Sequence, residues 1–243
     1  AHRNRYHPVL PVLKKLLIEG LVGEVLELRG RGKEDRRGGG EDLWVLGTHV
    51  FDLFYNLAGK PLSCSAEMRE GGQPVTKKDV YDGNEGLGPL AGDELHARWR
   101  MKNGWTAYFD SVRNRGRREA AFGLQVIGNK GVVDLRNDRE PLVHFMANSP
   151  WEPAKADRKW VPVTSAGVGQ PETHDVKGTI HNHVAAARDL LAAIKEDRPP
   201  LCDLEAGRMT AEFACSVFES HRLGGKSVEM PLKTRVNPLT LLD

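Results

Sequence analysis

Residues 94–113 read ELHARWRMKNGWTAYFDSVR, and this stretch decides the fold class. Its two halves, 94–101 and 105–113, together contain the aromatic residues Trp99, Trp105, Tyr108 and Phe109 and the β-branched Thr106 and Val112, which are residue types that favour strands. Between them, Lys102-Asn103-Gly104 is a turn signal short enough to join two neighbouring strands. The stretch therefore predicts an antiparallel β-hairpin in the middle of the sequence.

Similar segments extend outward from this hairpin in both directions. We expect further strands at 25–31, 62–69, 122–127, 132–136, 159–163 and 227–232. Apolar residues at helical spacing predict helices over 8–19, 43–57, 180–196 and 203–223. Because most strands cluster together and do not alternate with helices, we expect an α+β fold: an open, mainly antiparallel β-sheet with helices on one face.

Two segments between these elements are predicted as loops. Residues 29–40 are glycine-rich and charged, so we expect them to bury little surface. Residues 77–92 form a second loop, long enough to be functional or partly mobile. Aromatic residues of the central hairpin, such as Trp99, Trp105 and Phe109, exceed what one layer of helices covers, so we expect the exposed sheet face to form a homo-oligomer contact.

The composition argues against several classes of protein. The 243 residues carry 35 Lys+Arg and 33 Asp+Glu, a net charge of +2, so neither nucleic acid nor an anionic membrane is indicated as a partner. No apolar run approaches the roughly 18 to 20 residues that span a bilayer. Three cysteines without a CxxC pair make a reducing, cytoplasmic compartment the default expectation, and a chain that does not begin with Met leaves export undecided.

Several motifs occur in an order that points to one family. Glycines 38–40 are followed by Leu46-Gly47-Thr48-His49-Val50-Phe51-Asp52, which resembles the "GGG, then LGxHxxD" signature of the Gfo/Idh/MocA oxidoreductases (glucose-fructose oxidoreductase, inositol dehydrogenase and MocA). Residues 2–8 (HRNRYHP) and 20–25 (GLVGEV) resemble the family's "RxxP, then GxxGEV" run. Residues 127–131 (IGNKG) are similar to its "GxxG" hairpin, and 193–200 with 219–228 look like its closing helices and strand.

The resemblance extends only to the C-terminal half of such enzymes. It implies that residues 1–20 are the tail of an N-terminal Rossmann domain missing from this sequence, and that 21–243 form the C-terminal substrate-binding and oligomerisation domain. Neither the family's Glu-Lys-Pro motif nor a GxGxxG fingerprint occurs here. We therefore expect NAD or NADP to be bound by the missing domain and not by this chain alone, which we expect to be inactive.

The resemblance assigns the catalytic role to His49. In the family, a histidine and a carboxylate on the first helix of the substrate domain share the proton transfer with the lysine of the missing motif. A neutral imidazole can accept a hydroxyl proton near neutral pH. Val45 stands where the family often has Asp, four residues before the histidine. Asp42, two turns before His49, either replaces that carboxylate at the substrate or caps the helix.

Three further residues are candidates for substrate binding. Asp52 follows His49 by three residues and is placed to orient its ring or to cap a neighbouring turn. Lys33 and Arg36 lie in the loop that the family uses beside its substrate, although solvated loop charges are the better explanation of them. His181 and His183 are two residues apart and do not face one another on a helix, so no metal site is expected.

The resemblance implies an NAD(P)-dependent oxidoreductase acting on a sugar or polyol hydroxyl. Two alternatives stay open at this point. The loss of the carboxylate at Val45 also fits a non-catalytic carbohydrate-binding or scaffold module. A nicotinamide-dependent glycosidase or lyase is the other alternative, because some relatives use transient oxidation to make an adjacent bond labile.

Overall fold

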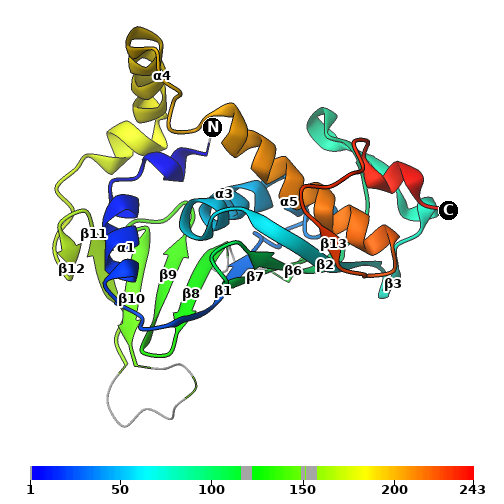
Figure 1. Ribbon diagram of the computed structural model, residues 1–243, viewed down its shortest axis with the longest axis horizontal. Helices are drawn as coiled ribbons and strands as arrows, with labels where there is room; N and C mark the ends of the chain where they lie inside the picture. The colour runs from blue at the N-terminus through cyan, green and yellow to red at the C-terminus, as the bar shows by residue number, and fades with distance from the viewer. Residues whose placement is uncertain (1, 116–121, 149–150, 152–157) are drawn as a thin grey trace. The chain divides into compact units, whose positions relative to one another are not determined.

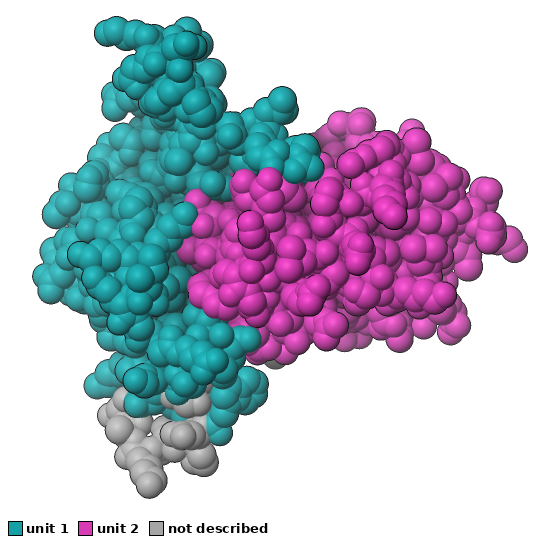
Figure 2. Space-filling model, in the orientation of Figure 1, with its two compact units in different colours: residues 1–26, 125–208 teal, residues 27–124, 209–243 magenta. Residues whose placement is uncertain are grey.

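The central hairpin forms where the sequence places it. In a computed structural model, strands β6 (Glu94–Met101) and β7 (Thr106–Val112) pair antiparallel, with Trp99 opposite Ala107. The structure describes residues 2–115, 122–148, 151 and 158–243. The chain divides into two compact units, each built from two segments: unit 1 from residues 1–26 and 125–208, and unit 2 from residues 27–124 and 209–243 (Figure 2).

Unit 2 is built on a mainly antiparallel sheet. Strand β6 also pairs antiparallel with β2 (Pro61–Glu70), and β2 in turn with β13 (Val228–Glu229) and the short β3 (Gln73–Pro74). On the other side of the hairpin, β1 (Val25–Arg31) pairs with β7 in parallel, with Gly30 opposite Phe109. The expected fold class is confirmed. Among the strand pairs that the structure describes in unit 2, the pair of β1 and β7 is the parallel one.

One face of this sheet carries the aromatic core. In β6 the buried residues alternate, so that Trp99 points to the same face as Leu95 and Met101, as expected for the two-residue repeat of a strand. Two helices, α3 (Gly47–Ala58) and α5 (Leu204–Arg222), contribute Phe51 and Phe213, whose rings stack 5.3 Å apart. Both rings also lie within 5.4 Å of the Trp99 ring, so both helices pack on the same face of the sheet (Figure 1).

The helix predicted over 43–57 is two helices. The first, α2 (Gly40–Val45), ends at Leu46, whose backbone φ of −115° departs from helical geometry, and α3 begins at the next residue. Gly47 is buried at this joint. A Cβ atom at this position would lie 3.1 Å from the Phe109 ring. A larger residue at 47 would push α3 away from β7.

The segment predicted as the long loop 77–92 is ordered. It forms two single turns, η2 (Lys77–Asp79) and η3 (Asn84–Gly86), and the small hairpin of β4 (Tyr81–Gly83) and β5 (Gly88–Leu90). Asn237, which precedes the C-terminal turn η5 (Pro238–Leu241), donates a 2.8 Å hydrogen bond to the carbonyl of Pro89. The hairpin is therefore held by the end of the chain, which sequence patterns do not predict.

Unit 1 has its own antiparallel strands. They are β9 (Gly131–Arg136), β10 (Val143–Ala147), β11 (Val161–Thr164) and β12 (Gly167–Val168), preceded along the chain by β8 (Gly123–Gly128). The predicted helices of this unit are α1 (Val9–Ile18) and α4 (Val184–Glu196), accompanied by η1 (Arg3–Tyr6) and the π-helical η4 (Lys177–His181). Strands β10 and β12 were not predicted, because β10 alternates weakly and β12 has two residues.

Candidate functional site

His49 lies in the first turn of α3 and is partly exposed. The opposite side of the same helix, including Val50, Phe51 and Phe54, is fully buried, so the backbone that carries His49 is fixed by the aromatic core. The imidazole meets the ring of Phe122 edge to face, with centroids 6.3 Å apart and an interplanar angle of 83°. This contact lies beside a histidine that still reaches solvent.

Asp52 lies on the same helix and has no exposed surface. A carboxylate in that position does not reach the surface that His49 reaches, so any effect of Asp52 on a bound ligand is indirect. Val45, which stands at the family's usual carboxylate position, is half-buried.

Asp42 is fully buried and holds the loop that precedes it. Its carboxylate accepts hydrogen bonds from the backbone N–H of Lys33 at 3.2 Å and of Glu34 at 3.1 Å, and from the hydroxyl of Ser111 at 2.5 Å. Burial raises the pKa of Asp42, and these three hydrogen bonds oppose the rise. The N-cap residue of α2 is Gly39, so the interpretation of Asp42 as a helix cap is wrong.

Glu34 is a second buried carboxylate in this loop, and the sequence analysis missed it. It is 2% exposed, accepts two hydrogen bonds from the Arg31 guanidinium, and accepts a third from the backbone N–H of Val112 at 3.0 Å. Ser111 completes the arrangement, because its hydroxyl oxygen accepts a 3.0 Å hydrogen bond from the N–H of Gly39. The prediction that residues 29–40 bury little surface is therefore wrong.

The three consecutive glycines are close-packed against other backbone. A Cβ at Gly38 would overlap Arg113, one at Gly39 the carbonyl oxygen of Gly92, and one at Gly40 the carbonyl oxygen of Ala91. Gly39 also has a φ of +91°, a conformation that favours glycine. A dinucleotide needs such glycines to leave open space for its pyrophosphate, and here the protein's own chain fills that space. These residues do not fit a nicotinamide dinucleotide.

The basic residues of the loop differ in what they can contact. Arg37 is held by Asp35 through two hydrogen bonds of 3.0 and 2.6 Å, which keep the pKa of Asp35 below its usual range. Arg36 is exposed, and Lys33 is half-buried. The structure thus supports a loop whose backbone is fixed by Asp42 and Glu34 and which carries two basic side chains at its surface.

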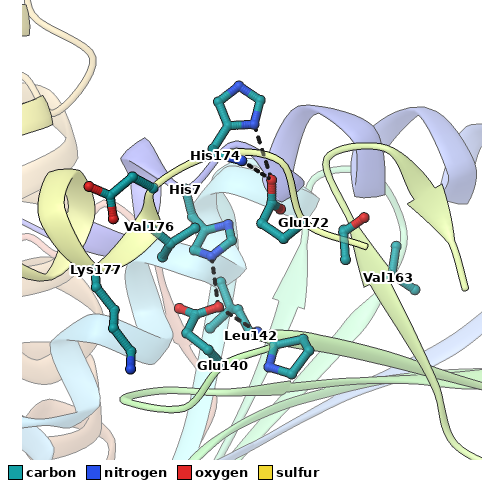
Figure 3. A pocket seen from close by; sticks show the side chains of 11 residues that line it. His7, Glu140, Leu142, Val163, Glu172, His174, Val176 and Lys177 are labelled. Carbon is teal, nitrogen blue, oxygen red and sulfur yellow. Dashed lines mark hydrogen bonds and ion pairs between the residues drawn. The ribbon is translucent and has the colours of Figure 1, made fainter. Parts of the chain in front are cut away.

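Unit 1 contains a separate pocket of about 300 Å³ (Figure 3). Glu140 bonds the Nε2 atoms of His7 at 3.2 Å and of His181 at 2.9 Å. The backbone N–H of Val9 donates to Nδ1 of His7, so the ring proton of His7 lies on Nε2 and is donated to Glu140. Burial alone would raise the pKa of Glu140, but the bonds from the two histidines bring it below its usual range.

A second carboxylate, Glu172, lines the same pocket. It accepts hydrogen bonds from the hydroxyl and the backbone N–H of Ser165, and it bonds His174 (Figure 3). Burial alone would raise the pKa of Glu172, but these bonds lower it to about 2. Sequence reasoning missed this pocket because its residues come from five separate stretches of the chain. Among the residues that the structure describes, no three His, Cys, Asp or Glu side chains are grouped to hold a metal ion.

The comparisons with known proteins agree with the motifs. The profile described as "Oxidoreductase family, C-terminal alpha/beta domain" of the Gfo/Idh/MocA proteins matches residues 14–230. The chain belongs to this family. A search of curated proteins gave no significant match. Because the matched profile is that of the C-terminal domain, the chain is assigned as an oxidoreductase C-terminal domain.

Solved structures share this fold. Levoglucosan dehydrogenase, in complex with NADH and L-sorbose, is 20% identical with a TM-score of 0.67, over 95% of this chain and 65% of that one. An oxidoreductase domain protein from Kribbella flavida is 19% identical (TM-score 0.65; 95% and 66%). The WlbA dehydrogenase from Bordetella pertussis, in complex with NADH and UDP-GlcNAcA, is 16% identical (TM-score 0.61; 96% and 63%). The chain thus spans about two thirds of the length of these proteins or slightly less.

A helix that spans a bilayer needs about 20 predominantly apolar residues. None of the helices in the described part of the chain is both long and apolar enough to cross a membrane.

Proposed function

We propose that this chain is the substrate-binding half of an NAD(P)-dependent oxidoreductase acting on a sugar or polyol hydroxyl. The observation that carries the proposal is the partly exposed imidazole of His49 on a helix whose other side is fixed in the core. Membership of an oxidoreductase family supports the reaction class. The sugars named in the complexes of levoglucosan dehydrogenase and WlbA support the substrate class.

In the proposed reaction, His49 accepts the proton of the substrate hydroxyl. A neutral imidazole can accept such a proton, and the ring of His49 packs edge to face against that of Phe122. A bound nicotinamide cofactor would accept the hydride, and we assign its binding to a domain outside this sequence because the glycines at 38–40 leave it no space.

The loop at 32–39 supplies the other substrate contacts in this proposal. Lys33 and Arg36 are donors suited to hydroxyl or carboxylate oxygens. Asp42 is a positioning residue, because its carboxylate bonds the backbone of the loop that carries Lys33. Asp52, buried one turn after His49, is proposed in the same supporting role.

Replacement of His49 in the full-length enzyme tests the proposal. We expect His49→Ala to lower kcat by about 10²-fold to 10⁴-fold while the cofactor Kd is unchanged, because general base catalysis makes a contribution of that size. His144→Ala is the matched control, since His144 is also half-buried but lies on β10. The measurements are steady-state kinetics with a panel of sugars and polyols, and cofactor titration.

Two other results would replace this proposal. An unchanged kcat in folded His49→Ala would favour a non-catalytic carbohydrate-binding or scaffold module, which the valine at position 45 also permits. Release of an aglycone or of an unsaturated sugar, without net reduction of the cofactor, would favour a nicotinamide-dependent glycosidase or lyase.

A homo-oligomer through the sheet face is part of the proposal, but its basis differs from the sequence argument. Trp99 and Phe109 face the helices and are fully buried. The residues of β6 and β7 that point the other way include His96, whose two ring nitrogens bond the carboxylates of Asp110 and Glu94. A contact between two copies would therefore use polar groups, and light scattering at micromolar concentration tests whether it forms.

A further inference from the structure

Helix α4 exposes its apolar side. Leu190, Leu191 and Ile194 are 51%, 68% and 71% exposed, and helical spacing puts them on one face. Leu201 and Leu204, in the segment that follows, are 50% and 90% exposed. Large aliphatic side chains grouped in this way usually mark a surface that another protein surface covers. We call Leu190, Leu191 and Ile194, the three residues of α4 itself, the α4 patch.

The opposite side of α4 is already attached to unit 1 by polar groups. Asp189 accepts hydrogen bonds from the backbone N–H of Leu201, from Arg198 and from the Tyr6 hydroxyl. Ala193 is the buried residue of the helix. A 13-residue helix with so little of its apolar surface buried is only marginally stable by itself, so a partner on its apolar face would supply most of its packing energy.

The start of the described chain lies at this helix. The Tyr6 hydroxyl bonds Asp189 at 3.3 Å and accepts a 3.4 Å hydrogen bond from the N–H of Cys202, whose thiol lies 3.6 Å from the carbonyl of His2. Figure 1 shows the N-terminal end of the chain near the base of α4, with α4 projecting beyond it. A domain that precedes the described chain would therefore begin next to α4.

We propose that the α4 patch is the docking surface for the domain that precedes residue 1 in the full-length protein. About one third of a solved relative's length lies outside the part that it shares with this chain, and the matched profile is that of a C-terminal domain, so the remainder of such a protein lies on the N-terminal side. The inference rests on the proposed function in one respect, because both assume that a domain precedes residue 1. The partner of α4 would then belong to the same chain.

Hydrogen exchange of the full-length protein tests the docking. In wild-type protein we expect the amides of 190–195 to be protected, and in Leu191→Asp/Ile194→Asp we expect them to exchange at least about tenfold faster, because the charges prevent burial of this face. Ile18→Asp is the matched control: Ile18 is an 87% exposed aliphatic residue on α1 of the same unit, and its replacement is expected to leave exchange at 190–195 unchanged.

Cross-linking at Lys195, an exposed residue of α4, identifies the occupant. Links from Lys195 to lysines N-terminal to residue 1 of the same chain support the proposal. Links to a second copy, or a dimer that the double aspartate variant converts to monomer, overturn it, as does wild-type exchange at 190–195 as fast as in the variant. The softer Leu191→Ala/Ile194→Ala variant keeps helix propensity and serves if the aspartates impair folding. None of these measurements needs turnover, so a full-length protein without activity but with a protected α4 would contradict the proposed function alone.

Discussion

The carboxylate of Asp42 accepts hydrogen bonds from the chain's own backbone, and replacing Asp42 measures how much these bonds stabilise the protein. Asp42→Asn places an amide NH₂ opposite a backbone N–H or the Ser111 hydroxyl and leaves a buried donor unpaired. We expect a loss of about 1 to 3 kcal/mol in the free energy of unfolding. Glu41→Gln is the control, because Glu41 bonds only the exposed side chain of Asn84 among the hydrogen bonds described, and we expect it to change stability by less than about 0.5 kcal/mol.

The pH dependence of that variant has a definite sign. Burial raises the pKa of Asp42 in the folded state, so the folded protein binds this proton more tightly than the unfolded chain does. The associated stability is present below the ordinary pKa of aspartate and is lost as the pH rises through the raised pKa. Urea unfolding from pH 3 to 7 should therefore show the wild type losing stability relative to Asp42→Asn as the pH increases, and the opposite slope would contradict the assignment.

Glu172 in the pocket of unit 1 is expected to titrate in strong acid. Its pKa of about 2 arises from the bonds of Ser165 and His174, so its carboxylate contributes stability above the ordinary pKa of glutamate that is lost as the pH falls toward 2. Carboxyl-carbon NMR can follow this titration directly. We expect Ser165→Ala to raise the pH midpoint of the Glu172 titration. A midpoint near the ordinary pKa of glutamate in the wild type would show that Glu172 does not keep its bonds to Ser165 and His174 in solution.

Candidate site residues could be proposed from the sequence only where the signal is local. His49 and Asp42 occur within one recognisable run of sequence. Ser111 is 69 residues from Asp42 and Glu34 is 78 from Val112, and no pattern along the chain pairs residues so far apart. The role of Asp42 was uncertain for the same reason, because the atoms it bonds had not been placed.

At the scale of elements, glycines divide into those that the packing requires and those that it does not. Gly39→Ala would put a Cβ into the carbonyl of Gly92 at a φ of +91°, so we expect it to destabilise the protein by more than about 2 kcal/mol. Gly207→Ala, in the exposed part of α5 where a Cβ meets nothing, is expected to stabilise it by about 0.5 to 1 kcal/mol. Thermal or denaturant unfolding measures both, and equal effects would contradict this distinction.

The elements themselves were largely predictable because their patterns are short-range. Strand β6 has the predicted bounds, and α1 and α5 lie within a residue or two of theirs. The break at Leu46 was missed because the apolar spacing continues across it, so that only the tight approach of Gly47 to Phe109 reveals why two helices form. The parallel pairing of β1 with β7 was missed because register depends on residues far apart in sequence.

For the molecule as a whole, the decisive measurement is cofactor binding. We expect the 243-residue chain to bind neither NAD nor NADP measurably by calorimetry, because its consecutive glycines are filled by its own backbone. The full-length protein is expected to bind one of them in the micromolar range typical of cofactors. Micromolar binding by the 243-residue chain would contradict the assignment of the cofactor to another domain.

The order in which the chain supplies its two units has a consequence for synthesis. Unit 2 takes residues 27–124 and then 209–243, and residues 125–208 of unit 1 lie between these two segments in the sequence. Phe51, Trp99 and Phe109 therefore leave the ribosome long before Phe213, the ring that packs against Phe51 and Trp99. Until Phe213 is synthesised, the nascent chain exposes these aromatic side chains. Exposed apolar surface of this kind promotes aggregation and is bound by chaperones. A ribosome stalled before residue 209 would hold a protein that has most of its strands and no closed core in unit 2.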